Sequence, residues 1–149
     1  YNTSYHVRAY AVNGKGVGYS AYVIIKTRSS AKATIVNMTA RNPSPSTLDV
    51  SATISADGGA EITERGFVYS SKGTPSVEEC EKKIVMKGTV GEIGTTLTGL
   101  TGYSNYSIRA YAINKNGTAY SNTVTARTKK TDPSIDDPAF PETKTIKNK

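Results

Sequence analysis

The sequence has little of the chemistry from which catalytic and metal sites are built: it contains one cysteine, one histidine and no tryptophan. Cys80 alone cannot form a disulfide within the chain, and with His6 it falls short of the about four ligands that a zinc site needs. The chain beyond His6 contains no histidine that could serve as the general base of a Ser-His-Asp triad. We therefore expect no enzymatic activity, no catalytic residue, no metal site and no cofactor.

Long apolar runs and blocks of like charge are also missing. No stretch of about 18 apolar residues occurs, so we expect no membrane insertion. The net charge of +7 is spread along the chain, and no recognisable nucleic-acid-binding motif surrounds the aromatic residues. The sequence therefore predicts a solvated basic surface and no nucleic-acid partner.

The most informative feature that is present is an internal repeat. Residues 5–27 and 106–128 align without a gap at a constant offset of 101, with eleven identical pairs among 23 positions. A repeat with a spacing of about 100 residues corresponds to a whole domain rather than to one unit of a solenoid.

Each copy of the repeat predicts a β-hairpin. Residues alternate between two faces from Tyr106 to Ile113, with the period of two that is typical of a strand. Residues 114–117 (NKNG) then supply a turn, because Asn and Gly tolerate positive φ, and a second strand is predicted over 118–128. Residues 13–16 (NGKG) make the equivalent turn in the first copy.

The chain between the two copies is long enough for five further strands. Their predicted ranges are 33–39, 48–55, 62–70, 82–87 and 94–100. Residues 76–82 (SVEECEK) have a helical turn as an alternative. Seven short strands separated by turns rich in Gly, Pro and Asn indicate an all-β, immunoglobulin-like antiparallel sandwich.

Three motifs resemble those of a known family: DGGAEITERGFVYSS (57–71), LTGL (97–100) and YSIRAYAINKNGTAYSN (106–122). They resemble fibronectin type III repeats, and more narrowly the divergent tandem copies found in secreted and surface proteins of gut bacteria. The resemblance covers residues 32–128 in full and 1–28 in part. It implies a sandwich of about seven strands whose family motifs carry no catalytic residue.

The resemblance also implies structural roles for four residues. Tyr106 would be the tyrosine corner, with its ring in the core and its hydroxyl bonded to the backbone a few residues upstream. Phe67 and Tyr69 would face the core from the third strand, together with Leu100. Tyr69 stands where the family often has tryptophan.

The repeat divides the chain into four parts. We expect residues 1–28 to be the last two strands of an incomplete repeat, 29–31 a short linker, 32–128 a complete repeat, and 129–149 an extended linker or tail. An isolated hairpin is marginal in water and leaves unpaired edges. Two completions are open: upstream strands of a longer tandem array, or strands of another chain, which would give a strand-exchanged homodimer.

The remaining candidate residues concern binding. Alternation places Arg109, Tyr111 and Tyr120 on the outward face of one sheet, where they could hold a carbohydrate or protein ligand; the loops are the other candidate place. The competing explanation is cross-strand pairing, which stabilises a sheet by about 0.2–1 kcal/mol per pair.

By fold analogy, the sequence predicts a non-catalytic spacer or adhesion module of an extracellular or cell-surface bacterial protein. Its expected partners are the other domains of the same polypeptide. The alternative is a carbohydrate- or protein-binding module that uses the Arg/Tyr face or the loops.

Overall fold

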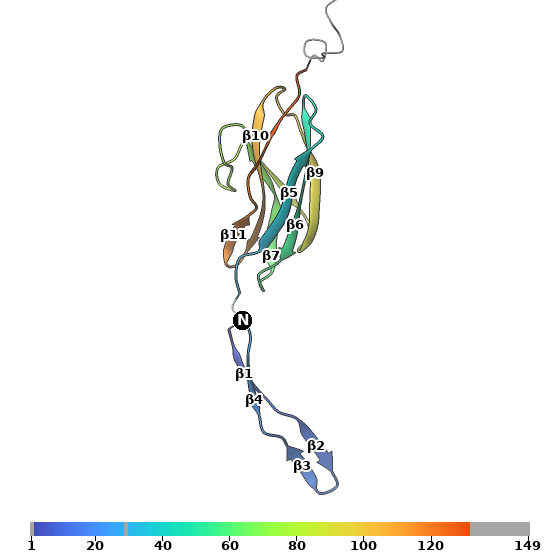
Figure 1. Ribbon diagram of the computed structural model, residues 1–149. Coiled ribbons are helices and arrows are strands. Elements are labelled where there is room, and N and C mark those ends of the chain that lie inside the picture. The colour runs from blue at the N-terminus through green and yellow to red at the C-terminus, as the bar shows by residue number, and fades with distance from the viewer. Residues whose placement is uncertain (1, 29, 132–149) are drawn as a thin grey trace, which may run out of the picture.

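The computed structural model describes residues 2–28 and 30–131, in which every regular element is a β-strand (Figure 1). The predicted fold class, an all-β antiparallel sandwich, is confirmed. The predicted tail lies outside the described residues from position 132 onward. The strands are β1 (Ser4–Val7), β2 (Tyr10–Asn13), β3 (Gly16–Tyr19), β4 (Val23–Lys26), β5 (Thr34–Arg41), β6 (Thr47–Ala56), β7 (Ile62–Ser70), β8 (Lys82–Met86), β9 (Gly91–Thr98), β10 (Asn105–Asn114), β11 (Gly117–Tyr120) and β12 (Val124–Arg127).

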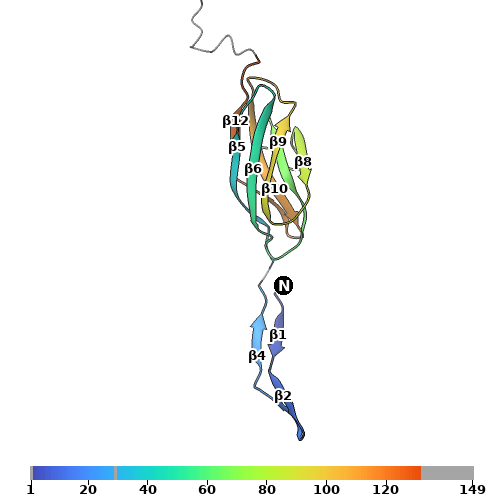
Figure 2. The ribbon, with the colours of Figure 1, turned by 90° about the vertical axis from the view of Figure 1, so that its right-hand side faces the viewer.

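Strands β5 to β12 form the two sheets of the sandwich. One sheet has the order β5-β6-β9. In the other, β8, β7 and β10 are neighbours, and both β11 and β12 pair with the far edge of β10. Figures 1 and 2 show the two layers in views turned by 90°. All these pairings are antiparallel, both between successive strands and between strands distant in sequence.

The core lies between the sheets because each strand has one apolar face. In β6, the side chains of Leu48, Val50, Ala52 and Ile54 are buried and alternate with polar residues that are half-buried or exposed. The inner face of β10 follows the same period of two. Full burial of a Val, Leu or Ile side chain contributes about 1.5–3 kcal/mol, so this alternation holds the two layers together.

The four residues with expected structural roles, Phe67, Tyr69, Leu100 and Tyr106, lie in this core. The Tyr106 hydroxyl accepts a 2.9 Å hydrogen bond from the backbone N–H of Thr101, five residues upstream, which is the geometry of a tyrosine corner. The rings of Tyr69 and Tyr106 meet edge to face, with centroids 5.8 Å apart. Burial raises the pKa of the Tyr69 hydroxyl.

The last strand differs from the prediction. The predicted strand over 118–128 is interrupted at residues 121–123, so that the sandwich has eight strands. The side chain of Ser121 occupies the break: its Oγ accepts the N–H of Ala110 at 3.0 Å and donates to the carbonyl of Asn122 at 2.7 Å. These bonds replace part of the strand ladder and redirect the chain toward β12.

Residues 2–28 form a two-stranded hairpin, in which β1 pairs with β4 and β2 with β3. No strand of the hairpin joins a sheet of the described sandwich. Its register repeats that of the last strands of the sandwich at the offset of 101: Tyr10 pairs with Tyr19, as Tyr111 pairs with Tyr120. The pairing of β1 with β4 likewise repeats that of β10 with β12. Similar sequence therefore gives the same local pairing in and out of the sandwich.

The chain enters and leaves the sandwich at opposite ends. At one end, the N–H of Ala31 donates to the carbonyl of Gly58, between β6 and β7, at 2.7 Å. At the other end, the N–H of Lys129 donates to the carbonyl of Ser44, between β5 and β6, at 3.1 Å. Strand β6 joins these two ends and has 10 residues. At about 3.3 Å per residue it spans about 33 Å.

Candidate functional site

Arg109 and Tyr120, two of the predicted binding residues, lie together on the outer face of the β10 sheet. The Arg109 guanidinium stacks over the Tyr120 ring, 4.1 Å from its centroid. Its Nε donates to the carbonyl of Ser121 at 3.3 Å and its Nη1 to that of Pro75 at 3.4 Å. The Tyr120 hydroxyl accepts a 2.8 Å hydrogen bond from the N–H of Val77. Both side chains are half-buried, and these polar groups bind other parts of the sandwich.

Tyr111, the third predicted binding residue, has no exposed surface (0%). Its hydroxyl donates a 2.8 Å hydrogen bond to Oε1 of Glu64 in the neighbouring strand β7. Tyr111 is on the predicted outer face of the sheet, but the expectation that it is exposed there is wrong. The physical reason is the segment 71–81 between β7 and β8, which stands on the outer side of β10 (Figure 1).

Segment 71–81 covers a second, small apolar cluster outside the main core. Pro75 of the segment is fully buried. Val68 is also fully buried and points to the outer face, because its neighbour Phe67 points inward. These two side chains and Tyr111 are all fully buried and lie outside the main core, so the sheet buries apolar surface on both of its faces.

Segment 71–81 is held by hydrogen bonds of its own, and the alternative helical turn over 76–82 is wrong. The N–H of Ser76 donates to the carbonyl of Glu79, and its Oγ accepts the Glu79 N–H, both at 2.9 Å. Oε2 of Glu81 accepts the N–H of Ser71 at 2.9 Å and its hydroxyl at 2.8 Å. These two bonds hold the pKa of Glu81 below its ordinary value.

Glu64 of β7 links side chains of the two neighbouring strands, β10 and β8. Its Oε1 accepts hydrogen bonds from the Tyr111 hydroxyl and, at 3.1 Å, from Nζ of Lys83. These bonds, the one from Tyr111 first, hold the pKa of Glu64 below its ordinary value. Burial and the Glu64 carboxylate raise the pKa of Tyr111. Near neutral pH the pair is therefore a neutral phenol donating to a carboxylate, which suits structure rather than proton transfer.

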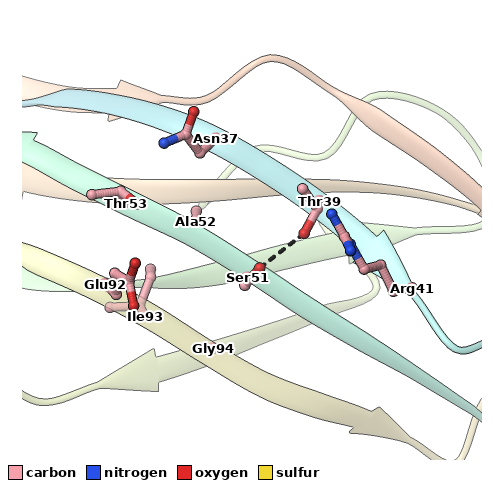
Figure 3. A pocket seen from close by; sticks show the side chains of 9 residues that line it. All are labelled: Asn37, Thr39, Arg41, Ser51, Ala52, Thr53, Glu92, Ile93 and Gly94. Atoms are coloured by element: carbon pink, nitrogen blue, oxygen red, sulfur yellow. Dashed lines mark hydrogen bonds between the residues drawn. The ribbon is translucent and has the colours of Figure 1, made fainter.

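A polar groove of about 540 Å³ crosses the outer face of the other sheet, β5-β6-β9 (Figure 3). The groove presents hydroxyl, amide, guanidinium and carboxylate groups and no aromatic ring. Oγ1 of Thr39 and Oγ of Ser51 share a 2.8 Å hydrogen bond across it. The residues that line it are Asn37, Thr39, Arg41, Ser51, Ala52, Thr53, Glu92, Ile93 and Gly94.

An irregularity in β5 shapes this groove. The pairing of β5 with β6 shifts register between Val36 and Thr39. Asn37, within the shift, has a φ of 55°, a left-handed conformation that asparagine tolerates. Met38 is buried, whereas Asn37 lines the groove. The groove could not be predicted from the sequence, because alternating polar residues mark an outer face but do not reveal its shape.

A second hollow, of about 580 Å³, lies at the base of segment 71–81. It includes part of one of the loops that are the alternative candidates for ligand binding. Cys80 contributes to it and is half-buried. The lining residues are Ser70, Ser71, Lys72, Gly73, Thr74, Glu79, Cys80 and Glu81.

Within residues 2–28 and 30–131, no three His, Cys, Asp or Glu side chains come together as they would to hold a metal ion. The same part of the chain has no helix of the length and apolar character needed to cross a membrane.

No family model and no curated protein sequence matches the chain. Among solved structures, the short form of the sensor domain of the anti-sigma factor RsgI4 from Pseudobacteroides cellulosolvens is similar to 68% of this chain and 99% of its own, with 16% identity and a TM-score of 0.51. Domains A168-A170 from titin match 79% of this chain and 38% of theirs, with 19% identity and a TM-score of 0.45. Domains FN1-FN3 of chicken CNTN1 match 87% of this chain and 42% of theirs, with 22% identity and a TM-score of 0.44.

The chain thus spans less than half the length of the titin and CNTN1 chains. The similarity to the sensor domain bears on the sandwich fold alone, because only 16% of the aligned residues are identical.

Proposed function

We propose that the chain is a non-catalytic spacer or adhesion module of a larger bacterial cell-surface or secreted protein, whose partners are the other domains of the same polypeptide. The observation that carries the proposal is that the chain enters the sandwich at one end, leaves it at the other, and is hydrogen-bonded at both. Modules joined in this way add their lengths head to tail.

The amino-terminal junction is clamped by asparagine side chains. The carbonyl of Ala31 accepts hydrogen bonds from Nδ2 of Asn114 at 2.7 Å and of Asn116 at 2.9 Å. Nδ2 of Asn114 also donates to the carbonyl of Asp57 at 2.8 Å, and the Asn114 side chain is buried. Each such bond contributes about 0.5–1.5 kcal/mol, so the backbone at Ala31 is held in one direction.

The carboxyl-terminal junction is tied in a comparable way. The N–H of Lys129 donates to the carbonyl of Ser44, and the carbonyl of Lys129 accepts the N–H of Tyr103 at 3.0 Å. The hydroxyl of Thr128, a buried residue, donates to the carbonyl of Thr101 at 2.6 Å. Two fixed junctions about 33 Å apart favour a stiff spacer over a loosely hinged domain.

The proposal is tested by displaying a reporter domain on a bacterial surface through residues 1–149. Replacing residues 30–131 by a flexible Gly/Ser linker of about 10 residues should shorten the average reach, because a coil spans only about 5–6 Å times the square root of its residue number, here about 17 Å against the about 33 Å of the sandwich. We expect the reporter to become less accessible to a bulky antibody but not to a small fluorescent ligand. Equal antibody access with both spacers would contradict the proposal.

A second candidate, binding of a polar ligand such as a glycan, is favoured by the groove on β5-β6-β9 and not by the covered Arg/Tyr face. Its exposed Arg41 and Glu92 are suited to hydrogen bonds with sugar hydroxyls. If the groove binds glycans, a glycan array probed with the chain should show retention that the Arg41→Ala/Glu92→Ala double variant loses. The variant Lys87→Ala/Glu61→Ala, which changes exposed charges outside the groove, should retain it.

A further inference from the structure

The hairpin of residues 2–28 exposes a large apolar surface. Ten of the fourteen large hydrophobic side chains that are exposed in the described residues lie in it. A free two-stranded hairpin is marginal in water, and folded proteins seldom expose a contiguous apolar patch that has no partner. The ten are Tyr5, Val7, Tyr10, Val12, Val17, Tyr19, Tyr22, Val23, Ile24 and Ile25.

The side-chain contacts of the hairpin repeat those of the last strands of the sandwich. The Arg8 guanidinium lies 3.9 Å from the centroid of the Tyr19 ring, and its counterpart pair is at 4.1 Å. Oγ of Ser20 accepts the N–H of Ala9 at 3.0 Å, the same distance as between the counterpart residues. The hairpin therefore already has the conformation that β10, β11 and β12 have in the sandwich.

We propose that residues 2–28 are a preformed closing strand pair, which completes a five-stranded unit of the type formed by β5 to β9. In the sandwich, β10 closes such a unit by pairing with β7 over Ser107–Asn114. Positions 6–13 of the hairpin, at the offset of 101, present the equivalent edge. The partner is thus a fibronectin type III-like unit whose β7-like edge is open.

The inner face of the hairpin fits such a partner, because its counterparts in β10 are all buried in the core. The counterparts of Tyr5, Val7, Ala9 and Ala11 are Tyr106, Ile108, Ala110 and Ala112. Tyr106 has a relative exposure of 2%, and the other three have 0%. Three of the four pairs are identical and the fourth, Val7 with Ile108, differs by one methylene, so the hairpin suits a core of similar dimensions.

The outer face of the hairpin indicates which further groups the partner must provide. Tyr10 is 70% exposed, whereas its counterpart is buried and donates to a carboxylate of β7. The counterparts of Arg8 and Tyr19 bind a carbonyl and an N–H of the segment between β7 and β8. The partner therefore offers a β7-like strand with a carboxylate toward Tyr10, followed by a covering segment that reaches Arg8 and Tyr19.

A second copy of this chain does not fit as the occupant. Its β7 edge is already filled by its own β10. If the hairpin of one copy replaced β10 to β12 of another, those strands would be released from the sandwich. One closing strand pair would be exposed for each that is buried, so no additional apolar surface would be buried.

The test is an extended chain in which a second copy of residues 30–102 is joined through Gly102 directly to Asn2, ahead of the full chain. Position 103 is the counterpart of Asn2, so this join preserves the spacing. Hydrogen exchange is then measured for the amides of residues 5–12. We expect exchange to slow by about 100-fold or more relative to the chain of residues 1–149, because the hairpin becomes part of a cooperative core.

Three further chains make the outcome decisive. In the extended chain, Ala11→Arg should abolish the protection, whereas in residues 1–149 the same change should alter nothing. In a control, residues 103–128 replace residues 2–27 of the extended chain, so that the added unit is closed by its own strands. Slow hydrogen exchange in this control shows that the added unit folds. If exchange is slow in the control but not in the extended chain, the proposal is wrong. Protection of the hairpin in residues 1–149 alone that is lost on dilution would also overturn it and identify a second copy as the occupant.

Discussion

The hydroxyl of Tyr111 in β10 donates a 2.8 Å hydrogen bond to Oε1 of Glu64 in the neighbouring strand β7. Tyr10 occupies the equivalent position of the hairpin. It pairs with Tyr19, as Tyr111 pairs with Tyr120, but it is 70% exposed. The chain thus holds one local structure in two environments. A substitution in β10 or β11 therefore has a matched control in the hairpin.

Tyr111→Phe should lower the free energy of unfolding by about 1–3 kcal/mol, because the hydrogen bond to the Glu64 carboxylate is lost while the buried ring is kept. Urea denaturation followed by circular dichroism measures the change. Tyr10→Phe removes the same hydroxyl where it is solvated and should change the value by less than about 0.5 kcal/mol. Equal effects of the two substitutions would show that the Tyr111–Glu64 bond does not stabilise the sandwich.

Glu64 should contribute a pH-dependent part of the stability. Its pKa in the folded state lies below the ordinary value of 4.5, so its contribution is fully present above about pH 4.5 and is lost as the pH falls through the folded pKa. Glu64→Gln should therefore destabilise the protein at pH 7, and the difference from the unchanged chain should shrink toward pH 2.5. Denaturation curves across this range measure it, and a difference that is constant with pH would contradict the role of the carboxylate.

The alternation of residues was sufficient to predict most of the strands, and the family resemblance implied the core position of Tyr106. It was also sufficient to place Tyr111 on the outer face, because the side-chain period of a strand is fixed at two. It could not predict that Tyr111 is buried. The covering segment 71–81 is irregular, is distant from Tyr111 in sequence and is held by single contacts such as that of Pro75 with Arg109. Periodicity carries no information on such contacts.

The groove on β5-β6-β9 escaped prediction for a related reason. It depends on a register shift in β5 and on the left-handed conformation of Asn37. Asparagine favours that conformation but does not require it. A shift by a residue or two changes the shape of a sheet face without changing the polar pattern that the sequence shows.

Gly66→Ala should disrupt the pairing of β7 with β8. A Cβ at Gly66 would overlap the backbone carbonyl of Ile84, so one strand must move. We expect a loss of about 2–3 kcal/mol, within the upper range for overpacking, and faster hydrogen exchange in β8. Gly18→Ala is the control, since nothing lies within 4 Å of its added Cβ and its counterpart position already holds Ala119. Unchanged exchange in β8 of Gly66→Ala would contradict the prediction.

Asn114→Asp should weaken the amino-terminal junction without removing the turn. The Oδ1 of Asn114 accepts the N–H of Asn116 at 2.9 Å, and a carboxylate can keep this bond. Its Nδ2, however, donates to the carbonyls of Ala31 and Asp57, and a carboxylate oxygen in its place would face two acceptors. We expect a loss of about 2–3 kcal/mol at neutral pH, and faster exchange of the Ala31 N–H, because a charge is buried against two carbonyl oxygens that each lose a donor.

Two comparisons separate this electrostatic explanation from a general loss of packing. The cost of Asn114→Asp, measured against the unchanged chain, should fall below about pH 4, where a protonated carboxyl can again donate one hydrogen bond. Asn13→Asp should have no effect at either pH, because Asn13 is exposed and its Oδ1 bond to the N–H of Lys15 is retained. If Asn114→Asp costs as little as Asn13→Asp, the carbonyl of Ala31 is not held by the clamp, and the rigid junction on which the spacer proposal rests is lost with it.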